Sequence, residues 1–293
     1  MASLMEGGLR TRGIIKSSTP AEPLFSIITV VYNGAAHIER AFESVLFQDY
    51  SNIEYIVVDG GSSDGTVEII RGHDNKIDYW VSEPDNGIYD AMNKGIVISK
   101  GDLIGFLNSD DYYEPGSIKD VVTTYLETGC RGIYFGNSYV IQEDLGIRYL
   151  SVGKASLWRG LGFKHQAMFV HRYVHEKIGL YNTAYRIAAD YDFVMNAVAK
   201  GVTLVHIDNN LVNYSNMGVS GINRIETLSE IRIIARGHYG LFSLPYLGFM
   251  MVFLRSCLFQ GVGRLVFFAF GEKALLAVRS IYTRLKCNDP NGQ

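Results

Sequence analysis

Cysteine and proline are scarce in this sequence, and neither sign of charge dominates it. Of its 293 residues only 3 are Cys and 6 are Pro, and the formal net charge is −3. The cysteines lie far apart, without a CxxC pair or a histidine at ligand spacing, so they indicate neither a disulfide framework nor a structural zinc site. The absence of a basic surplus argues against a protein that binds nucleic acid by neutralising its phosphates.

Long uninterrupted apolar runs are also missing. Residues 1–23 lack the apolar core of a signal peptide and are rich in Gly, Ser, Thr and Pro, so we expect a flexible leader there. The most apolar stretch, Leu241 to Phe270, is interrupted by Arg255 and Arg264. Neither half of it reaches the roughly 20 apolar residues that a membrane-spanning helix needs. We therefore expect a cytoplasmic protein.

Apolar strands alternate with amphipathic helices in the first half of the chain, and 47% of all residues are hydrophobic, enough for a large core. Strands are predicted over 25–32, 53–58, 77–81 and 103–107, with helices within 33–48, from 65 onward, over 87–98 and over 116–127. A hairpin over 132–140 and 146–151, a helix over 190–200 and a strand over 202–207 follow. This order predicts an α/β fold with a mostly parallel sheet flanked by helices.

Polar residues stand where the four early strands end. The ends read Tyr32-Asn33, Asp59-Gly60, Ser82 to Asp85 and Asn108 to Asp111, and three of them carry carboxylates. Ligands of such sheets bind outside the carboxyl ends of the strands. The adjacent Asp110 and Asp111 need either solvent or a cation, and Mg²⁺ or Mn²⁺ commonly takes one or two carboxylates together with substrate phosphate oxygens. A solvated turn is the alternative.

Four fragments together resemble glycosyltransferase family 2, the inverting enzymes with a GT-A fold. They are TVVYNG (29–34), VVDGGSSDGT (57–66), SEPDNGIYDAMNKG (82–95) and FLNSDD (106–111). The resemblance is nearest to bacterial exopolysaccharide and capsule transferases of the colanic-acid type. It implies a Rossmann-like GT-A catalytic domain over 24–222, with a nucleotide-binding half over 24–111 and an acceptor half over 112–222.

The resemblance also implies roles on the donor side. Tyr32 corresponds to the aromatic residue beside the nucleobase, Asp59 to the acidic residue against the base, Asp110 to the ribose position and Asp111 to the direct metal ligand. The further nucleotide contacts that it implies are Val30, Asp85 and Lys94. A solvated lysine is the alternative for Lys94. Many members have a second Asp where this chain has Gly60, which weakens the choice of uracil over guanine.

On the acceptor side, the helix that begins near Ala189 resembles the part of the family that carries the catalytic base. Asp190 is our choice for that base, with Asp192 as a weaker candidate and a helix cap as the alternative role. His165 and Gln166 are implied to lie beside the acceptor or the diphosphate, and a structural histidine is the alternative. Two family residues are absent, because Met92 replaces an Arg and Ala189 replaces a Glu.

Residues 223–293 are predicted to form a helical appendage. Residues 241–293 contain six Lys or Arg and two acidic residues, a net charge of +4 in a chain of −3. Apolar and basic helices of this kind suit a membrane interface. A contact between two copies of the chain, or a cap on the catalytic domain, is the alternative.

These observations predict a metal-dependent inverting glycosyltransferase that uses Mn²⁺ or Mg²⁺ and a nucleotide-sugar donor, with UDP favoured over GDP. We expect a glycan acceptor linked to lipid, a role in surface polysaccharide biosynthesis, and peripheral attachment to the inner face of the cytoplasmic membrane. A non-catalytic, membrane-associated scaffold with the same fold is the alternative. A nucleotidyltransferase or an NAD-dependent oxidoreductase is disfavoured, since YNGAAH follows the first strand where a glycine-rich phosphate loop would be needed.

Overall fold

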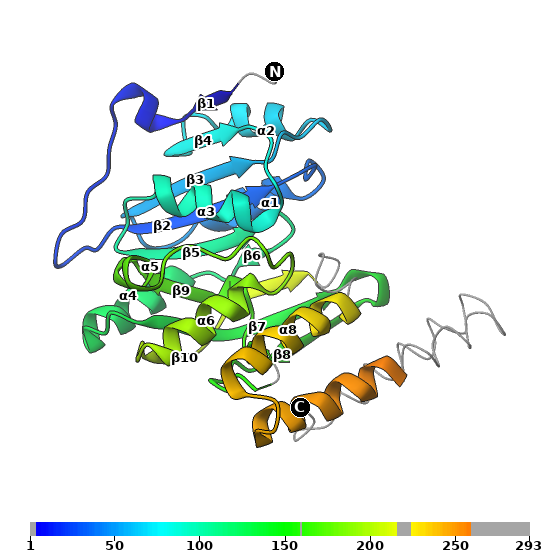
Figure 1. Cartoon of the computed structure of the whole chain (residues 1–293). Coiled ribbons are helices and arrows are strands. Elements are labelled where there is room, and N and C mark those ends of the chain that lie inside the picture. Colours follow the sequence, from blue (N-terminus) through cyan, green and yellow to red (C-terminus); the bar gives the residue numbers. More distant parts are fainter. Residues whose placement is uncertain (1–3, 159, 216–223, 259–293) are drawn as a thin grey trace.

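Strand β2 (Phe25–Val31) lies at the centre of the fold, and all seven of its residues are buried. The structure is a computed structural model and describes residues 4–158, 160–215 and 224–258 (Figure 1). β2 pairs in parallel with β3 (Ile53–Asp59) and with β5 (Leu103–Asn108), and β4 (Tyr79–Ser82) pairs in parallel with β3. Strands that are apolar on both faces require cover on both faces.

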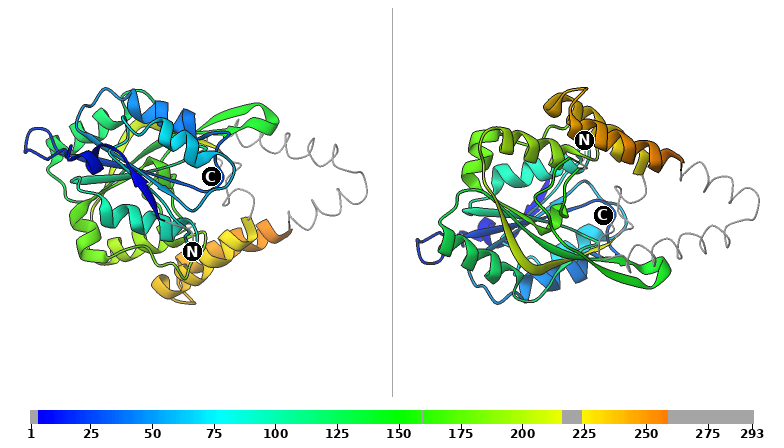
Figure 2. Two further views of the ribbon diagram at one scale, coloured as in Figure 1. Left: turned by 90° about the horizontal axis from the view of Figure 1, so that it is seen from above. Right: turned by 90° about the horizontal axis from the view of Figure 1, so that it is seen from below.

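Helices supply this cover, because alternate residues of β2 point to opposite sides of the sheet. Ile27 and Val31 belong to one buried cluster, which includes residues of α1 (Ile38–Leu46), α2 (Thr66–Gly72) and α4 (Ser117–Thr128). Ile28 and Val30 belong to the other, with residues of α3 (Ile88–Ile98), α5 (Arg172–Ile178) and α6 (Ala189–Ala199). Seen from above, the sheet lies between the blue helix on one side and the yellow and orange helices on the other (Figure 2, left).

Beyond β5 the sheet becomes mixed. β9 (Met168–His171) runs antiparallel to β5 and to β7 (Ile133–Gln142), whereas β10 (Leu204–Ser215) runs parallel to β7. Two short strands complete this side, β8 (Ile147–Ser151) against β7 and β6 (Tyr112–Tyr113) against β10. The predicted α/β fold with a mostly parallel, helix-flanked sheet is confirmed.

Strands β9 and β10 differ from the prediction. β9 was not predicted, because four buried residues after an irregular stretch carry no periodicity that distinguishes a strand. β10 extends well past Ile207, where the prediction ended it. Its pairing with β7 shifts register between Ile207 and Val212, and such bulges interrupt the alternation on which a sequence-based prediction depends.

The expected flexible leader is wrong for residues 5–12, which are folded against the sheet, whereas residues 13–22 follow as a mostly exposed segment without helix or strand. Strand β1 (Met5–Gly7) pairs antiparallel with β4, and the 3₁₀ helix η1 (Leu9–Arg12) follows it. Arg10 and Lys16 form ion pairs with the buried Glu54 and Asp78. These contacts connect positions distant in sequence, so the local Gly, Ser and Pro content gave no indication of them.

Two helices of the predicted appendage fall within the described residues. α8 (Arg224–Tyr239) packs Ile231, Ile234 and Ala235 into the core cluster that also contains residues of α6. Residues 244–258 form a second helix. None of the helices among the described residues combines the length and the apolar character needed to cross a bilayer. The rest of the predicted appendage, residues 259–293, lies outside the described residues, and the domain boundaries at 111/112 and 222/223 stay a prediction.

The ion pair of the N-terminal segment gives a test of this packing. Arg10→Ala leaves the carboxylate of Glu54, whose side chain is 3% exposed, without its cation. We expect the free energy of unfolding to fall by about 1–3 kcal/mol, measured by urea denaturation. Arg12→Ala is the matched control, because the Arg12 and Asp74 side chains are 47% and 32% exposed and such pairs contribute about 0–1 kcal/mol. Equal losses in the two variants would contradict this account.

Candidate active site

The pairing register brings the polar strand ends to one edge of the sheet. Val31 lies opposite Asp59, Asp59 lies opposite Ser82, and Val30 lies opposite Asn108. Tyr32 follows β2 directly and is 67% exposed, so its ring is available for stacking on a planar base. Val30 is different: its side chain is buried in the core beneath α3, which leaves only its backbone to meet a nucleotide.

Asn33 connects the first strand end to the second. Its φ of 51° is the only positive value at a non-glycine residue among the described residues, a conformation that Asn tolerates better than most residues. The Asn33 N–H donates to Ser62 Oγ over 2.7 Å, and Asn33 Oδ1 accepts from the Ser63 N–H over 2.9 Å. The exposed Tyr32 is therefore fixed beside the turn that follows β3.

The carboxylate of Asp59 is used inside that turn. It is fully buried, and Oδ2 accepts hydrogen bonds from the Gly61 and Ser62 N–H groups and from the Ser82 hydroxyl. In the conformation described, the turn therefore already uses the carboxylate that was predicted to contact the base. A base beside Tyr32 would meet the surface of the turn, and the contact with Asp59 stays a prediction.

Asp85 occupies the space beside Gly60. A Cβ added at Gly60 would lie 2.3 Å from Asp85 Oδ2, so a residue larger than glycine would displace this carboxylate. Asp85 Oδ1 accepts the Gly87 N–H over 2.8 Å, and partial burial raises the pKa of Asp85. The absence of a second Asp at position 60 thus coincides with a carboxylate that reaches the same place from the neighbouring strand end.

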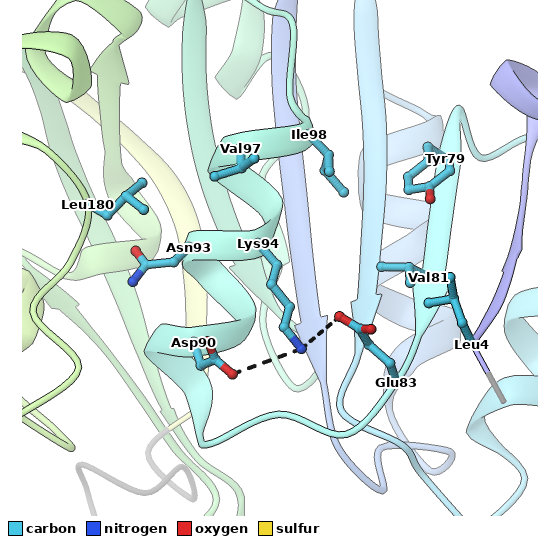
Figure 3. Close-up of a pocket in the computed structure, with 10 residues that line it drawn as sticks. All are labelled: Leu4, Tyr79, Val81, Glu83, Asp90, Asn93, Lys94, Val97, Ile98 and Leu180. Carbon is cyan, nitrogen blue, oxygen red and sulfur yellow. Dashed lines mark ion pairs between the residues drawn. The ribbon is translucent and has the colours of Figure 1, made fainter. Parts of the chain in front are cut away.

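The structure places Lys94 beside the residues that follow β4, where it is held by the protein itself. Its Nζ lies 2.8 Å from Glu83 Oε1 and 3.1 Å from the Pro84 carbonyl oxygen, and it lines a pocket between α3 and β4 (Figure 3). None of the other predicted site residues lines this pocket. The ion pair with Glu83 supports the alternative role that the sequence left open, a lysine of the surface.

Asp111 is the most unusual carboxylate at this edge. It is 1% exposed, and its Oδ1 accepts the Ser215 N–H over 2.7 Å. Its Oδ2 is buried without a hydrogen-bond partner among the described residues, and the same holds for Asn108 Oδ1 in the same turn. Burial, and then the neighbouring Asp110, raise the pKa of Asp111 well above its usual range. Asp110 is less enclosed, and burial raises its pKa as well.

These oxygens fit a hard divalent cation. Mn²⁺ and Mg²⁺ prefer oxygen ligands, and two buried oxygens without partners are what such an ion would satisfy. No cluster of three or more His, Cys, Asp or Glu side chains occurs in the described part of the chain. Asp111 would therefore hold the ion with little protein support, and substrate phosphate oxygens and water would complete the coordination.

Two cations near Asp111 were not singled out from the sequence. The Nζ of Lys164 lies 4.2 Å from the ring centroid of Tyr214, the residue before Ser215, and an Arg40 guanidinium nitrogen donates to the Asp110 carbonyl oxygen over 3.0 Å. Both positive charges lower the pKa of Asp111 against the larger effect of burial. No spacing rule connects positions 40, 111 and 164, so only the fold could reveal this group.

Asp190 lies in the first turn of α6, and the neighbouring elements hold it. Its Oδ1 accepts the Tyr191 N–H over 2.8 Å and lies 3.1 Å from the Tyr89 hydroxyl of α3. Glu230 of α8 supports the start of the same helix, because its carboxylate accepts the N–H groups of Arg186, Ile187 and Ala188, each over 2.9 Å. Free N–H groups at a helix start favour a negative charge.

His165 begins the 3₁₀ helix η3 (His165–Ala167) and lies within an aromatic cluster. Its ring stacks on Phe106 with centroids 5.4 Å apart, and its Nε2 lies 3.0 Å from the Tyr181 hydroxyl. Burial lowers the pKa of His165, and Gln166 is buried beside it. The structure supports a structural role for His165 here, and direct contacts of His165 and Gln166 with a substrate stay predictions.

Comparison with known proteins gives concordant matches. A family model described as "Glycosyl transferase family 2" matches residues 26–186. An uncharacterized glycosyltransferase of Mycobacterium tuberculosis is 36% identical over 198 residues, covering 62% of this chain and 72% of the relative. A PGL/p-HBAD biosynthesis glycosyltransferase of Mycobacterium bovis is 34% identical over 181 residues, covering 59% of this chain and 69% of the relative.

Solved structures share the fold. S. aureus TarS 1-349 in complex with UDP has a TM-score of 0.55 and 18% identity, covering 73% of this chain and 66% of that one. The mannosyltransferase PcManGT from Pyrobaculum calidifontis, in complex with GDP-Man and Mn²⁺, has a TM-score of 0.60 and 16% identity, covering 96% of this chain and 81% of that one. At such low identity the likeness extends to the fold alone.

The contribution of the Glu230 hydrogen bonds to stability can be measured with a substitution. Glu230→Ala leaves three N–H groups before α6 without their acceptor. We expect the free energy of unfolding to fall by about 1–3 kcal/mol in urea denaturation. Glu226→Ala is the control. It removes an exposed carboxylate from the first turn of α8, the helix that also carries Glu230, and should change the free energy of unfolding by no more than about 0.5 kcal/mol. A Glu230→Ala variant as stable as the control would show that this carboxylate does not fix the entry to α6.

Proposed function

The chain belongs to glycosyltransferase family 2, and from this premise we propose that it transfers a sugar from a nucleoside-diphosphate sugar to a glycan acceptor with inversion at the anomeric carbon. The observation that carries the proposal is the buried Asp111 at the edge where the strands end, with one carboxylate oxygen that has no hydrogen-bond partner among the described residues. Asp190 supplies a second carboxylate on a different element. A donor and an acceptor require two such separate groups.

On the donor side, we assign Tyr32 to the nucleobase and Asp111 to the cation, with Asp110 toward the ribose. Asp111 would hold Mn²⁺ or Mg²⁺, and the ion would supply positive charge for the diphosphate. Lys164 and Arg40 supply further positive charge near Asp111, in a chain in which Met92 replaces the family arginine. We propose UDP as the nucleotide; one of the structural neighbours carries UDP and another GDP-Man, so binding has to decide between them.

On the acceptor side, Asp190 is the proposed general base. The acceptor hydroxyl gives its proton to the Asp190 carboxylate while its oxygen bonds to the anomeric carbon. The bond from that carbon to the diphosphate breaks on the opposite face, and its electron pair leaves with the nucleoside diphosphate. One displacement of this kind inverts the configuration.

The donor site is tested by calorimetric titration. In the presence of Mn²⁺ or Mg²⁺ we expect UDP to bind more tightly than GDP. In a chelator UDP should bind at least tenfold more weakly, because a cation held by Asp111 would supply positive charge for the diphosphate. Asp111→Asn keeps the size of the side chain and its bond from Ser215, and it should remove the metal dependence. Asp49→Asn is the matched control, since that carboxylate is 50% exposed and pairs with Lys119. If neither nucleotide binds the folded protein under any metal condition, the hypothesis of a non-catalytic scaffold replaces that of a glycosyltransferase.

A lipid surface is the proposed location of the acceptor. The helix over residues 244–258 exposes an apolar stripe, with members alternately three and four residues apart and 46% to 85% exposed: Leu244, Leu247, Met251, Leu254 and Leu258. Phe249, on the other side of the helix, is fully buried in the core, so this helix is attached to the domain. An apolar stripe followed by a basic segment is typical of an interfacial helix. We propose attachment to the inner face of the cytoplasmic membrane and a lipid-linked acceptor in surface polysaccharide biosynthesis.

Vesicle sedimentation tests this attachment. With vesicles of phosphatidylethanolamine and phosphatidylglycerol, the double substitution Met251→Glu and Leu254→Glu should reduce the bound fraction at least fivefold, since charges are expensive to bury in an apolar layer. Phe47→Glu is the matched control, because Phe47 is 81% exposed and lies outside the stripe. Light scattering of the same variants measures the mass in solution. A dimer that the double substitution dissociates, together with no binding to vesicles, would assign the stripe to a second copy of the chain.

A further inference from the structure

Tyr89 links the candidate base to the helix that covers the sheet. It lies on α3, is 7% exposed, and its hydroxyl oxygen is 2.8 Å from the Ile187 carbonyl oxygen and 3.1 Å from Asp190 Oδ1. Its ring lies against Tyr181, with centroids 5.6 Å apart. The backbone before α6 and the carboxylate within α6 therefore meet the same hydroxyl.

The hydrogen bonds of Asp190 distinguish its two oxygens. Within the described residues, both hydrogen bonds that reach its side chain end on Oδ1, one from the Tyr191 N–H and one from the Tyr89 hydroxyl. The single hydroxyl proton of Tyr89 is shared between the Ile187 carbonyl oxygen and Oδ1, and a carboxylate oxygen has two lone pairs, so both contacts to Asp190 fall on Oδ1. Oδ2 is the oxygen that remains to take a proton from an acceptor hydroxyl.

Tyr89 is suited to act as a permanent donor. Burial, followed by the charge of Asp190, raises its pKa well above the usual value for a tyrosine, so the phenol is protonated at neutral pH. A hydrogen bond donated to a carboxylate favours the ionised form, which is the form a general base needs.

Resting on the proposed role of Asp190, we propose that Tyr89 is a positioning residue, whose hydroxyl holds Oδ1 of Asp190 and leaves Oδ2 for the acceptor. Tyr89 itself touches no substrate in this scheme. Its effect reaches the reaction only through the orientation of the Asp190 carboxylate.

Other ionisable groups also face this carboxylate. The charge of Asp190 acts on Tyr181 from the loop before α6 and on His165 from η3. Asp192 follows on the same helix, and Glu230 of α8 binds the backbone just before it. Burial lowers the pKa of His165 and raises that of Asp192, so a titration assigned to Asp190 must be distinguished from both.

Carbon-13 labelling of the aspartate carboxyl groups makes that distinction without an acceptor. The Asp190 signal is the one that Asp190→Asn removes, and its titration is followed by nuclear magnetic resonance in the full chain. Tyr89→Phe keeps the ring and removes the donor, so the signal should titrate about 0.5–1 pH unit higher. Tyr191→Phe is the matched control: that side chain is 1% exposed, its hydroxyl donates to the Leu157 carbonyl oxygen over 2.8 Å, and its N–H to Asp190 is kept.

An unchanged titration in Tyr89→Phe, or an equal shift in Tyr191→Phe, overturns the proposal. Should Tyr89→Phe fail to fold, 3-fluorotyrosine at position 89 replaces it. This side chain is a stronger donor, so it should move the Asp190 titration to lower pH, and an unchanged or higher value overturns the proposal equally.

Turnover separates this inference from the proposed function. Release of nucleoside diphosphate is measured with UDP-N-acetylglucosamine and GDP-mannose, with water as the acceptor. Asp190→Asn should lower kcat at least 100-fold, and Tyr89→Phe about threefold to tenfold with KM for the donor unchanged. Full turnover in Asp190→Asn would remove the base assignment, whatever the titration shows. A slow Asp190→Asn with a fully active Tyr89→Phe and no shift would remove only the role of Tyr89.

Discussion

The burial of the Asp111 carboxylate is the constraint on which the rest of the site depends. An ionised carboxylate away from water is unfavourable by several kcal/mol unless a partner compensates for it. Here the Ser215 N–H satisfies one oxygen, and Lys164 and Arg40 supply positive charge at a longer range, but Oδ2 has no partner in the described part of the chain. The hard cation proposed for the donor site, together with a diphosphate, would satisfy this oxygen.

The two sides of the site rest on different kinds of support. Tyr32 and Asp111 follow β2 and β5, which are each paired on both sides, so the sheet itself positions these two residues. Asp190 instead lies on α6, whose buried residues pack into the core. Tyr89 of α3 and Glu230 of α8 add hydrogen bonds at the start of that helix. The proposed donor edge is therefore positioned by strand pairing and the proposed base by helix packing.

Local pattern predicted the sheet edge, and the fold alone decided which side chains face it. Periodicity predicted the alternation of strands and helices, and the structure confirms this fold. The acidic residues at the strand ends were read directly from the sequence, and the pairing register brings these ends to one edge. The same reasoning treated Lys94 and Asp59 as available to a nucleotide. In the structure Glu83 pairs with Lys94, and the turn after β3 uses the carboxylate of Asp59. Residues such as Arg40, Lys164 and Glu230 act over long separations in sequence, and no spacing pattern predicts contacts of that kind.

The C-terminal helices connect the proposed membrane surface to the proposed base. α8 carries Glu230, which binds the backbone before α6, and the next helix carries the exposed apolar stripe on one side and the buried Phe249 on the other. Because both helices are packed into the same core as α6, a lipid surface bound at the stripe would have a fixed distance from Asp190. An acceptor presented from that surface would approach from the side of α6, while the donor occupies the strand edge. The appendage would then determine where the acceptor enters, in addition to attaching the enzyme to the membrane.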